Sequence, residues 1–214
     1  MYPANDINGI LAQEKDLEGS HAIILLFVKP SDVNADSIIK KFNYLHYRSK
    51  RYCSIYLVGY SQDYFENYQD AQEIIGVDNT TWYYSDGCFV DVCDQLEVRL
   101  KNWRYCGEPE MIILQNSSTF AGGCTLDFRH YNYIDINYGI EKGYIDSFAR
   151  FMERMIDACR SEVDASAALT LANRKRLNGK KLVEIAIENC PRLPSSAKRI
   201  LKDKLFFKSS KTAA

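Results

Sequence analysis

The sequence lacks the features that send a chain into or across a membrane. Residues 1–19 are polar and mixed, without the basic-then-apolar order of a secretory signal peptide. The longest aliphatic run, Ala22–Val28, has the length of a strand and falls far short of a membrane span. We therefore expect a cytoplasmic protein without a membrane partner.

The motifs that identify common enzyme classes are also missing. The chain has no Gly-rich loop ending in Lys-Ser or Lys-Thr, no Gly-x-Gly-x-x-Gly after its first strand and no Gly-x-Ser-x-Gly. It has no Cys-x-x-Cys, and Cys88 and Cys93 stand five positions apart on a predicted helix, where they face different directions. These absences argue against a nucleotide-binding loop, a serine hydrolase, a thiol-redox enzyme and a zinc site. We assign no metal ligand.

Cysteine and histidine give little sign of catalysis. The seven cysteines are an odd number scattered through predicted strands and helices. Without an export signal they indicate reduced thiols and not a disulfide framework. The three histidines, His21, His46 and His130, cannot be matched to a Ser or Cys nucleophile from the sequence.

Apolar segments of two kinds alternate through the first part of the chain. Strands are predicted at Ala22–Val28, Cys53–Gly59, Thr80–Tyr84 and Met111–Leu114, an edge strand within Thr125–Tyr138, and helices at Asp6–Leu17, Ala35–Arg48, Tyr64–Ile75, Phe89–Trp103 and Gly143–Arg160. Strands alternating with helices of this length favour right-handed βαβ units. We therefore predict a three-layer α/β fold with a mainly parallel sheet of about five strands, one of them at an edge.

The charge of the chain divides it into two parts. Residues 1–170 hold 15 basic and 25 acidic side chains, whereas Leu171–Ala214 holds 12 basic and 3 acidic ones. Apolar residues recur at helical spacing within Lys180–Cys190 and Ala197–Leu205, which indicates short helices and not a disordered tail. We predict an α/β domain over residues 1–162 and a small, basic, helical segment over residues 163–214.

A basic helical segment has three kinds of partner that fit its charge. It can neutralise the phosphates of a nucleic acid, bind an acidic protein, or lie against the acidic first part of its own chain. The predicted binding residues are eight of the basic side chains of this segment: Arg174, Lys175, Arg176, Lys180, Lys181, Lys198, Arg199 and Lys202.

Acidic residues follow three of the predicted strands. Asp32, Asp63 and Asp86 each come shortly after a strand, and Lys29 ends the first strand. If the strands are neighbours in a doubly wound sheet, these side chains meet in one crevice at the carboxyl edge. Carboxylates grouped there suit Mg²⁺ and phosphate chemistry, with Lys29 stabilising phosphoryl oxygens. Capping of the following helices explains the same residues without any catalysis.

Two functions are compatible with these features. The first is a non-catalytic subunit of a larger cytoplasmic assembly, whose basic segment binds an acidic protein or nucleic acid without a cofactor. The second is a Mg²⁺-dependent phosphoryl-transfer or nuclease-type enzyme, or a nucleotide-sensing domain, that uses Lys29, Asp32, Asp63 and Asp86. We favour the first, because the charge division is clear and no complete catalytic motif is present.

Overall fold

The computed structural model describes residues 1–15, 21–32, 35–49, 52–118, 124–161 and 207–209. The helices are α1 (Ile7–Lys15), α2 (Ala35–Ile39), α3 (Phe42–Ser49), α4 (Asp86–Arg99), α5 (Ile136–Glu141) and α6 (Phe148–Ser161), with a 3₁₀ turn η1 at Val77–Asn79. The strands are β1 (Tyr2–Ala4), β2 (Ala22–Phe27), β3 (Cys53–Val58), β4 (Tyr60–Ser61), β5 (Gln72–Ile75), β6 (Thr81–Tyr84), β7 (Glu110–Ser118), β8 (Cys124–Asp135) and β9 (Phe207–Ser209).

The fold is mixed α/β and contains two sheets. The main sheet has the order β1-β3-β2-β7-β8-β9, and a smaller sheet has the order β4-β6-β5. In the main sheet β1 and β2 run parallel to β3, whereas β7 runs antiparallel to β2, β8 to β7 and β9 to β8. The prediction of a mainly parallel sheet is therefore wrong. The sheet is mixed because β6 joins the smaller sheet, while β7 and β8 pair with each other as an antiparallel hairpin.

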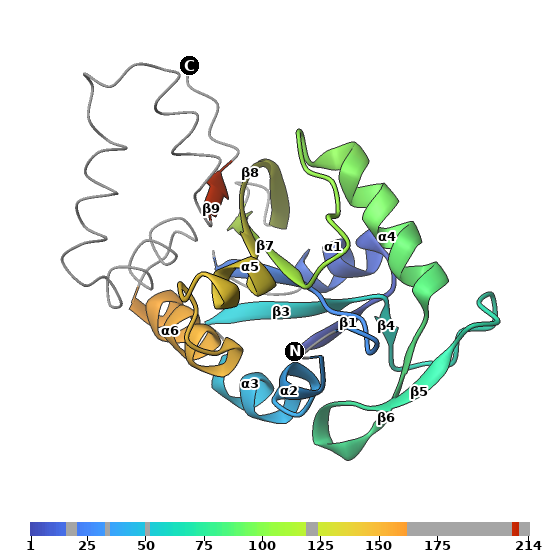
Figure 1. Cartoon of the computed structure of the whole chain (residues 1–214). Coiled ribbons are helices and arrows are strands. Elements are labelled where there is room, and N and C mark those ends of the chain that lie inside the picture. Colours follow the sequence, from blue (N-terminus) through green and yellow to red (C-terminus); the bar gives the residue numbers. More distant parts are fainter. Residues whose placement is uncertain (16–20, 33–34, 50–51, 119–123, 162–206, 210–214) are drawn as a thin grey trace, which may run out of the picture.

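The apolar runs of the sequence make the centre of the main sheet. Every residue of β2 and β3 is buried, as expected for strands that are covered on both faces. The helices form two groups, because α1 contacts α4, whereas α6 contacts α2 and α3. The two groups lie on opposite sides of the main sheet (Figure 1).

Several predicted elements have different bounds or a different kind of structure. The predicted helix Ala35–Arg48 is two helices, α2 and α3, and the predicted strand Thr125–Tyr138 is β8 followed by α5. The prediction that this strand lies at an edge is wrong, because β8 pairs with β7 on one side and with β9 on the other. The predicted helix Tyr64–Ile75 is wrong, because its last four residues form β5. The short strand β1 was not predicted. The predicted helical segment 163–214 lies outside the described residues, apart from β9.

The chain enters the smaller sheet through Gly59. This residue joins β3 to β4 with a φ of 83°, a conformation that favours glycine. A Cβ atom at this position would lie 2.7 Å from Cβ of Phe89. Hydrogen bonds hold the turn on both sides: Gly59 donates its N–H to the carbonyl of Ala4, and its own carbonyl accepts from the N–H of Ser85.

The smaller sheet has a buried face and an exposed face. On β6, Trp82 and Tyr84 are buried, at 0 % and 1 % exposed, whereas Thr81 is exposed and Tyr83 half-buried. Tyr84 packs against Tyr60, with 5.0 Å between the ring centroids, and the Tyr60 hydroxyl donates to the carbonyl of Val28. The sheet is therefore anchored to the main core by aromatic side chains. Within the described part of the chain, no helix has the length and apolar character needed to cross a membrane.

Candidate functional site

Asp32 closes the turn that follows β2. Its Oδ2 accepts a hydrogen bond from the N–H of Lys29 at 2.7 Å, and its carbonyl accepts one from the N–H of Ala35 at the start of α2. Burial raises the pKa of Asp32, and the charges of Glu108 and Asp86 add to the rise, although the N–H and the charge of Lys29 oppose it. The charge of Asp86 thus acts on Asp32.

Lys29 is directed toward aromatic rings. Its Nζ lies 5.1 Å from the ring centroid of Phe89 and 5.5 Å from that of Tyr105. A lysine ammonium at this distance over a ring is attracted by the negative face of the π-system. Lys29 therefore links the end of β2 to α4 and to the chain before β7.

Asp86 begins α4, and Asp70, which precedes β5, is bonded to the start of the same helix. Ser85 is the N-cap, and its Oγ accepts from the N–H of Cys88 at 3.0 Å. Oδ1 of Asp86 accepts from the hydroxyl of Tyr84 at 2.8 Å. Asp70 accepts from the N–H of Gly87 and from the hydroxyl of Ser85, and these two bonds lower its pKa. The chain's own carboxylate thus occupies the helix terminus where a phosphate would otherwise bind.

Asp63 does not share this edge. It is exposed and follows β4 in the smaller sheet, and its N–H donates to Oγ of Ser61 at 3.1 Å. Of the other two predicted carboxylates, Asp86 is the one whose charge acts on Asp32. The described residues contain no group of three or more His, Cys, Asp or Glu side chains that could hold a metal ion.

A buried acid that the sequence analysis missed lies beside this edge. Glu110 begins β7 between Phe27 of β2 and Asp135 of β8, and it is 0 % exposed. Burial raises its pKa to about 8, although a hydrogen bond from Sγ of Cys106 to Oε2, at 3.5 Å, opposes the rise. Glu110 is therefore largely protonated at neutral pH.

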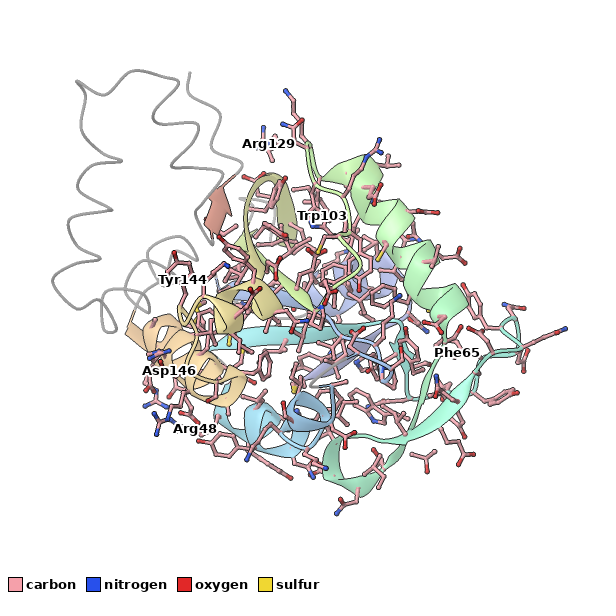
Figure 2. All side chains as sticks on the ribbon, viewed as in Figure 1. Arg48, Phe65, Trp103, Arg129, Tyr144 and Asp146 are labelled. Carbon is pink, nitrogen blue, oxygen red and sulfur yellow. The ribbon has the colours of Figure 1, made fainter. Side chains whose placement is uncertain are left out.

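The surroundings of Glu110 are sparsely bonded. Among the described residues, Oε1 of Glu110, Nε1 of Trp103 and the hydroxyl of Tyr105 have no hydrogen-bond partner of good geometry, although the side chains of Tyr133 and Trp103 lie near enough to Glu110 to lower its pKa. The ring of Trp103 packs on Phe27, with 5.1 Å between centroids, in the region between α4 and β7 (Figure 2). Because Glu110 has no exposed surface, we expect its ionisation to act on the stability of the fold. A Glu before an apolar strand is the only sequence signal for this site.

A second buried acid, Glu14, lies near the amino ends of β2 and β3. Glu14 of α1 accepts from the hydroxyl of Tyr56 at 2.7 Å, and its Oε2 lies 2.9 Å from Nε2 of His21. The same Nε2 lies 3.1 Å from Oγ of Ser54. Burial alone would raise the pKa of Glu14, but hydrogen bonds with His21, Tyr56 and Ser54 lower it.

This arrangement differs from a Ser-His-acid triad. A triad uses one ring nitrogen of the histidine for the nucleophile and the other for the acid. Here both contacts are made by Nε2 of His21, and Ser54 is only 3 % exposed. The cluster therefore satisfies a buried carboxylate between α1 and the strands, and we assign it no catalytic role.

The predicted partner-binding residues lie outside the described residues, all of them between positions 174 and 202: Arg174, Lys175, Arg176, Lys180, Lys181, Lys198, Arg199 and Lys202. A charge feature that the sequence analysis missed does lie within them. Residues 52–98 contain nine acidic side chains and no Lys, Arg or His. A running count of charge along the chain would have found this stretch.

Comparison with known proteins gives this site no precedent. No family model, no curated protein and no solved structure matches the chain.

Proposed function

We propose that the protein is a non-catalytic subunit of a larger cytoplasmic assembly, and that its basic segment, residues 163–214, binds an acidic partner protein. The observation that carries the proposal is the charge of residues 171–214, with 12 basic and 3 acidic side chains. The other 170 residues have an excess of acidic over basic side chains, 25 to 15, so the basic charge is concentrated in one segment. Such a concentration of charge attracts a partner of opposite sign.

The bonds of the candidate carboxylates support a non-catalytic role. Asp32 holds a turn and Asp86 accepts from Tyr84, so each has a structural partner. Asp63 stands apart from both in the smaller sheet. These are the roles that helix capping and turn formation predict for Asp at the ends of strands.

Neutralising part of the basic segment tests the proposal. We compare the full chain with the variant Lys198→Gln/Arg199→Gln/Lys202→Gln, using a fluorescent polyglutamate peptide as the acidic probe and anisotropy as the readout. We expect the variant to bind about tenfold more weakly or worse, because three charge contacts are removed. The control Lys40→Gln/Lys41→Gln/Lys142→Gln changes the charge equally on the described body, and should bind as the wild type does.

Two further arms separate the alternatives. Tighter binding of a labelled DNA duplex, with a steep loss on adding salt, would make nucleic acid the partner instead of an acidic protein. Mg²⁺ titrated into the full chain is expected to release no heat. Heat that disappears in Asp32→Ala would favour the Mg²⁺-dependent enzyme. Equal binding by the basic-segment variant and the control would contradict the proposal.

A further inference from the structure

Residues 52–98, which we call the acidic stretch, run from β3 through α4 and include the whole smaller sheet. Eight of its nine acidic side chains are exposed: Asp63, Glu66, Asp70, Glu73, Asp78, Asp86, Asp91 and Asp94. The ninth, Glu97, lies 4.0 Å from Arg104, which is the one ion pair made by the stretch among the described residues. The smaller sheet, the segments that connect its strands, and α4 therefore carry negative charge that is barely offset by ion pairs among the described residues.

The strand β5 is an edge of this surface. Among the described strands it pairs only with β6, so one side of its backbone has no strand beside it. Edge strands in soluble proteins are commonly protected by lysine, by proline or by a covering element. The sequence of β5, Gln-Glu-Ile-Ile, has neither lysine nor proline, and Ile75 is 70 % exposed. This is the form of edge to which another polypeptide strand can be added.

The outer face of the sheet continues this apolar surface. In the strand register Glu73 faces Tyr83 and Ile75 faces Thr81, so Glu73 and Ile75 project on the same side. Tyr64, 62 % exposed, packs edge-to-face on Tyr83 with 5.3 Å between ring centroids. The outer face thus presents a carboxylate flanked by an isoleucine and two tyrosine rings.

The inner face fixes the geometry of this edge. Ile74 faces Trp82, which is 0 % exposed, and the indole of Trp82 covers Gly76 so closely that a Cβ there would lie 2.2 Å from the ring. In Figure 2, Phe65 marks the chain leading to β5, on the opposite side of the molecule from Tyr144 and Asp146. The edge is thus held in place, and it lies far from the helix end at Ser161 that precedes the basic segment (Figure 1).

From these features we propose that β5 binds a basic, extended segment of a partner protein as an additional strand of the smaller sheet. A Lys or Arg of the added strand would face Glu73, and an apolar residue two positions along would face Ile75. Opposite charges and apolar pairs at such cross-strand positions stabilise strand pairing. Pairing of β5 with β5 of a second copy is disfavoured, because it would bring two acidic stretches together.

The test uses the full chain and a short fluorescent peptide that repeats the unit Lys-Thr-Val-Thr, with anisotropy as the readout. This probe places lysine and valine alternately on one face, at the spacing of Glu73 and Ile75. We expect saturable binding that weakens with added salt, since part of the affinity is between exposed charges. The same peptide with proline in place of valine keeps its charge but cannot pair as a strand, so it should not bind.

Two variants test whether the peptide binds at β5. Ile75→Lys should weaken binding of the probe by about tenfold or more, because it removes the apolar contact and repels a basic strand. The matched control is Val98→Lys, an equal change of charge at an 87 % exposed valine in the same acidic stretch, on α4. It should change the affinity by less than about twofold, the effect of a distant surface charge.

Three results would overturn the proposal. Equal binding of the proline peptide, or equal losses in Ile75→Lys and Val98→Lys, would show attraction by charge without strand addition. Absence of binding at low salt would remove the site altogether. Binding of the probe that becomes about tenfold tighter in Lys198→Gln/Arg199→Gln/Lys202→Gln would show that this chain's own basic segment, and not a partner protein, occupies the edge.

Discussion

The two sheets of this protein use their strands in opposite ways. In the main sheet β2 and β3 are covered on both faces, and all of their residues are buried. In the smaller sheet only one face is buried, the one that carries Trp82 and Tyr84, and β5 is almost wholly exposed. One sheet therefore serves as the core of the domain, and the other as a surface held on that core by a few aromatic contacts.

The largest effect expected is on the smaller sheet, from Gly76→Ala. The added Cβ would lie 2.2 Å from the indole of Trp82, which is fully buried and cannot move freely. We expect a loss of about 3 kcal/mol or more in the stability of this sheet, because overpacking displaces the ring. Amide hydrogen exchange should accelerate in β5 and β6 while β2 and β3 stay protected.

The control for that experiment is Gly9→Ala in α1. There the nearest atom is Oδ2 of Asp6, at 3.2 Å, and a shift of a few tenths of an ångström makes room while Oδ1 keeps its hydrogen bond from the N–H of Gly9. Alanine in a helix is favoured over glycine by about 0.5–1 kcal/mol, so this variant should be neutral or stabilised. Uniform acceleration of exchange across both sheets in Gly76→Ala would mean that the smaller sheet is not a separate unit of stability.

For the main sheet we expect a stability that depends on pH. The pKa of Glu110 is about 8 in the folded chain against an ordinary 4.5, so the folded chain holds a proton that the unfolded chain releases. Its stabilising effect is complete below the ordinary value and is lost as the pH rises toward 8. Between the ordinary value and pH 7 the wild type should therefore lose on the order of 3 kcal/mol of its free energy of unfolding. Glu110→Gln should not show this loss.

Denaturant unfolding of wild type and Glu110→Gln across this pH range measures the effect. The exposed Glu141→Gln controls for the loss of one carboxylate, and it should follow the wild-type profile. Parallel profiles for wild type and Glu110→Gln would contradict the assignment of a buried, protonated Glu110.

The smallest effect is expected at the contact between the two regions. Asp70 precedes β5 and accepts hydrogen bonds from Gly87 and Ser85 at the start of α4. Asp70→Asn should cost about 1 kcal/mol, as removal of a helix cap does. Because the pKa of Asp70 is lowered, its contribution is present above the ordinary value and is lost as the pH falls. Asp94→Asn, on the same helix, should have no measurable effect on thermal unfolding.

The sequence predicted the parts of the fold that depend on local pattern. Ala22–Val28 and Cys53–Gly59 are continuous apolar runs, and the structure confirms a buried strand at each. The direction of β7 depends on pairing between distant residues, and no local pattern reports it. The prediction of a helix over Tyr64–Ile75 was wrong. The tyrosines of this segment have helical spacing, but the packing of Trp82 on Gly76 is made by a strand.

The candidate site was predictable in part for the same reason. Asp32 and Asp86 follow strands, so their place near the end of β2 could be foreseen, as could the role of Ser85 as a cap. The place of Asp63 depended on which sheet β4 would join. Glu110 and Asp70 were missed, because burial of one and the helix contact of the other arise only from tertiary structure.

The turn at Gly59 decides whether this chain can be divided. The backbone of this one residue is bonded to β1 through Ala4 and to the start of α4 through Ser85. A break at this position would leave the second half without the strand edge that orients its first residues, and the first half without the aromatic rings that cover its core. Fragments 1–58 and 59–161 should therefore fail to fold separately, and should regain structure only when mixed. The smaller sheet can therefore open locally in the folded chain, but the two sheets should fold only together.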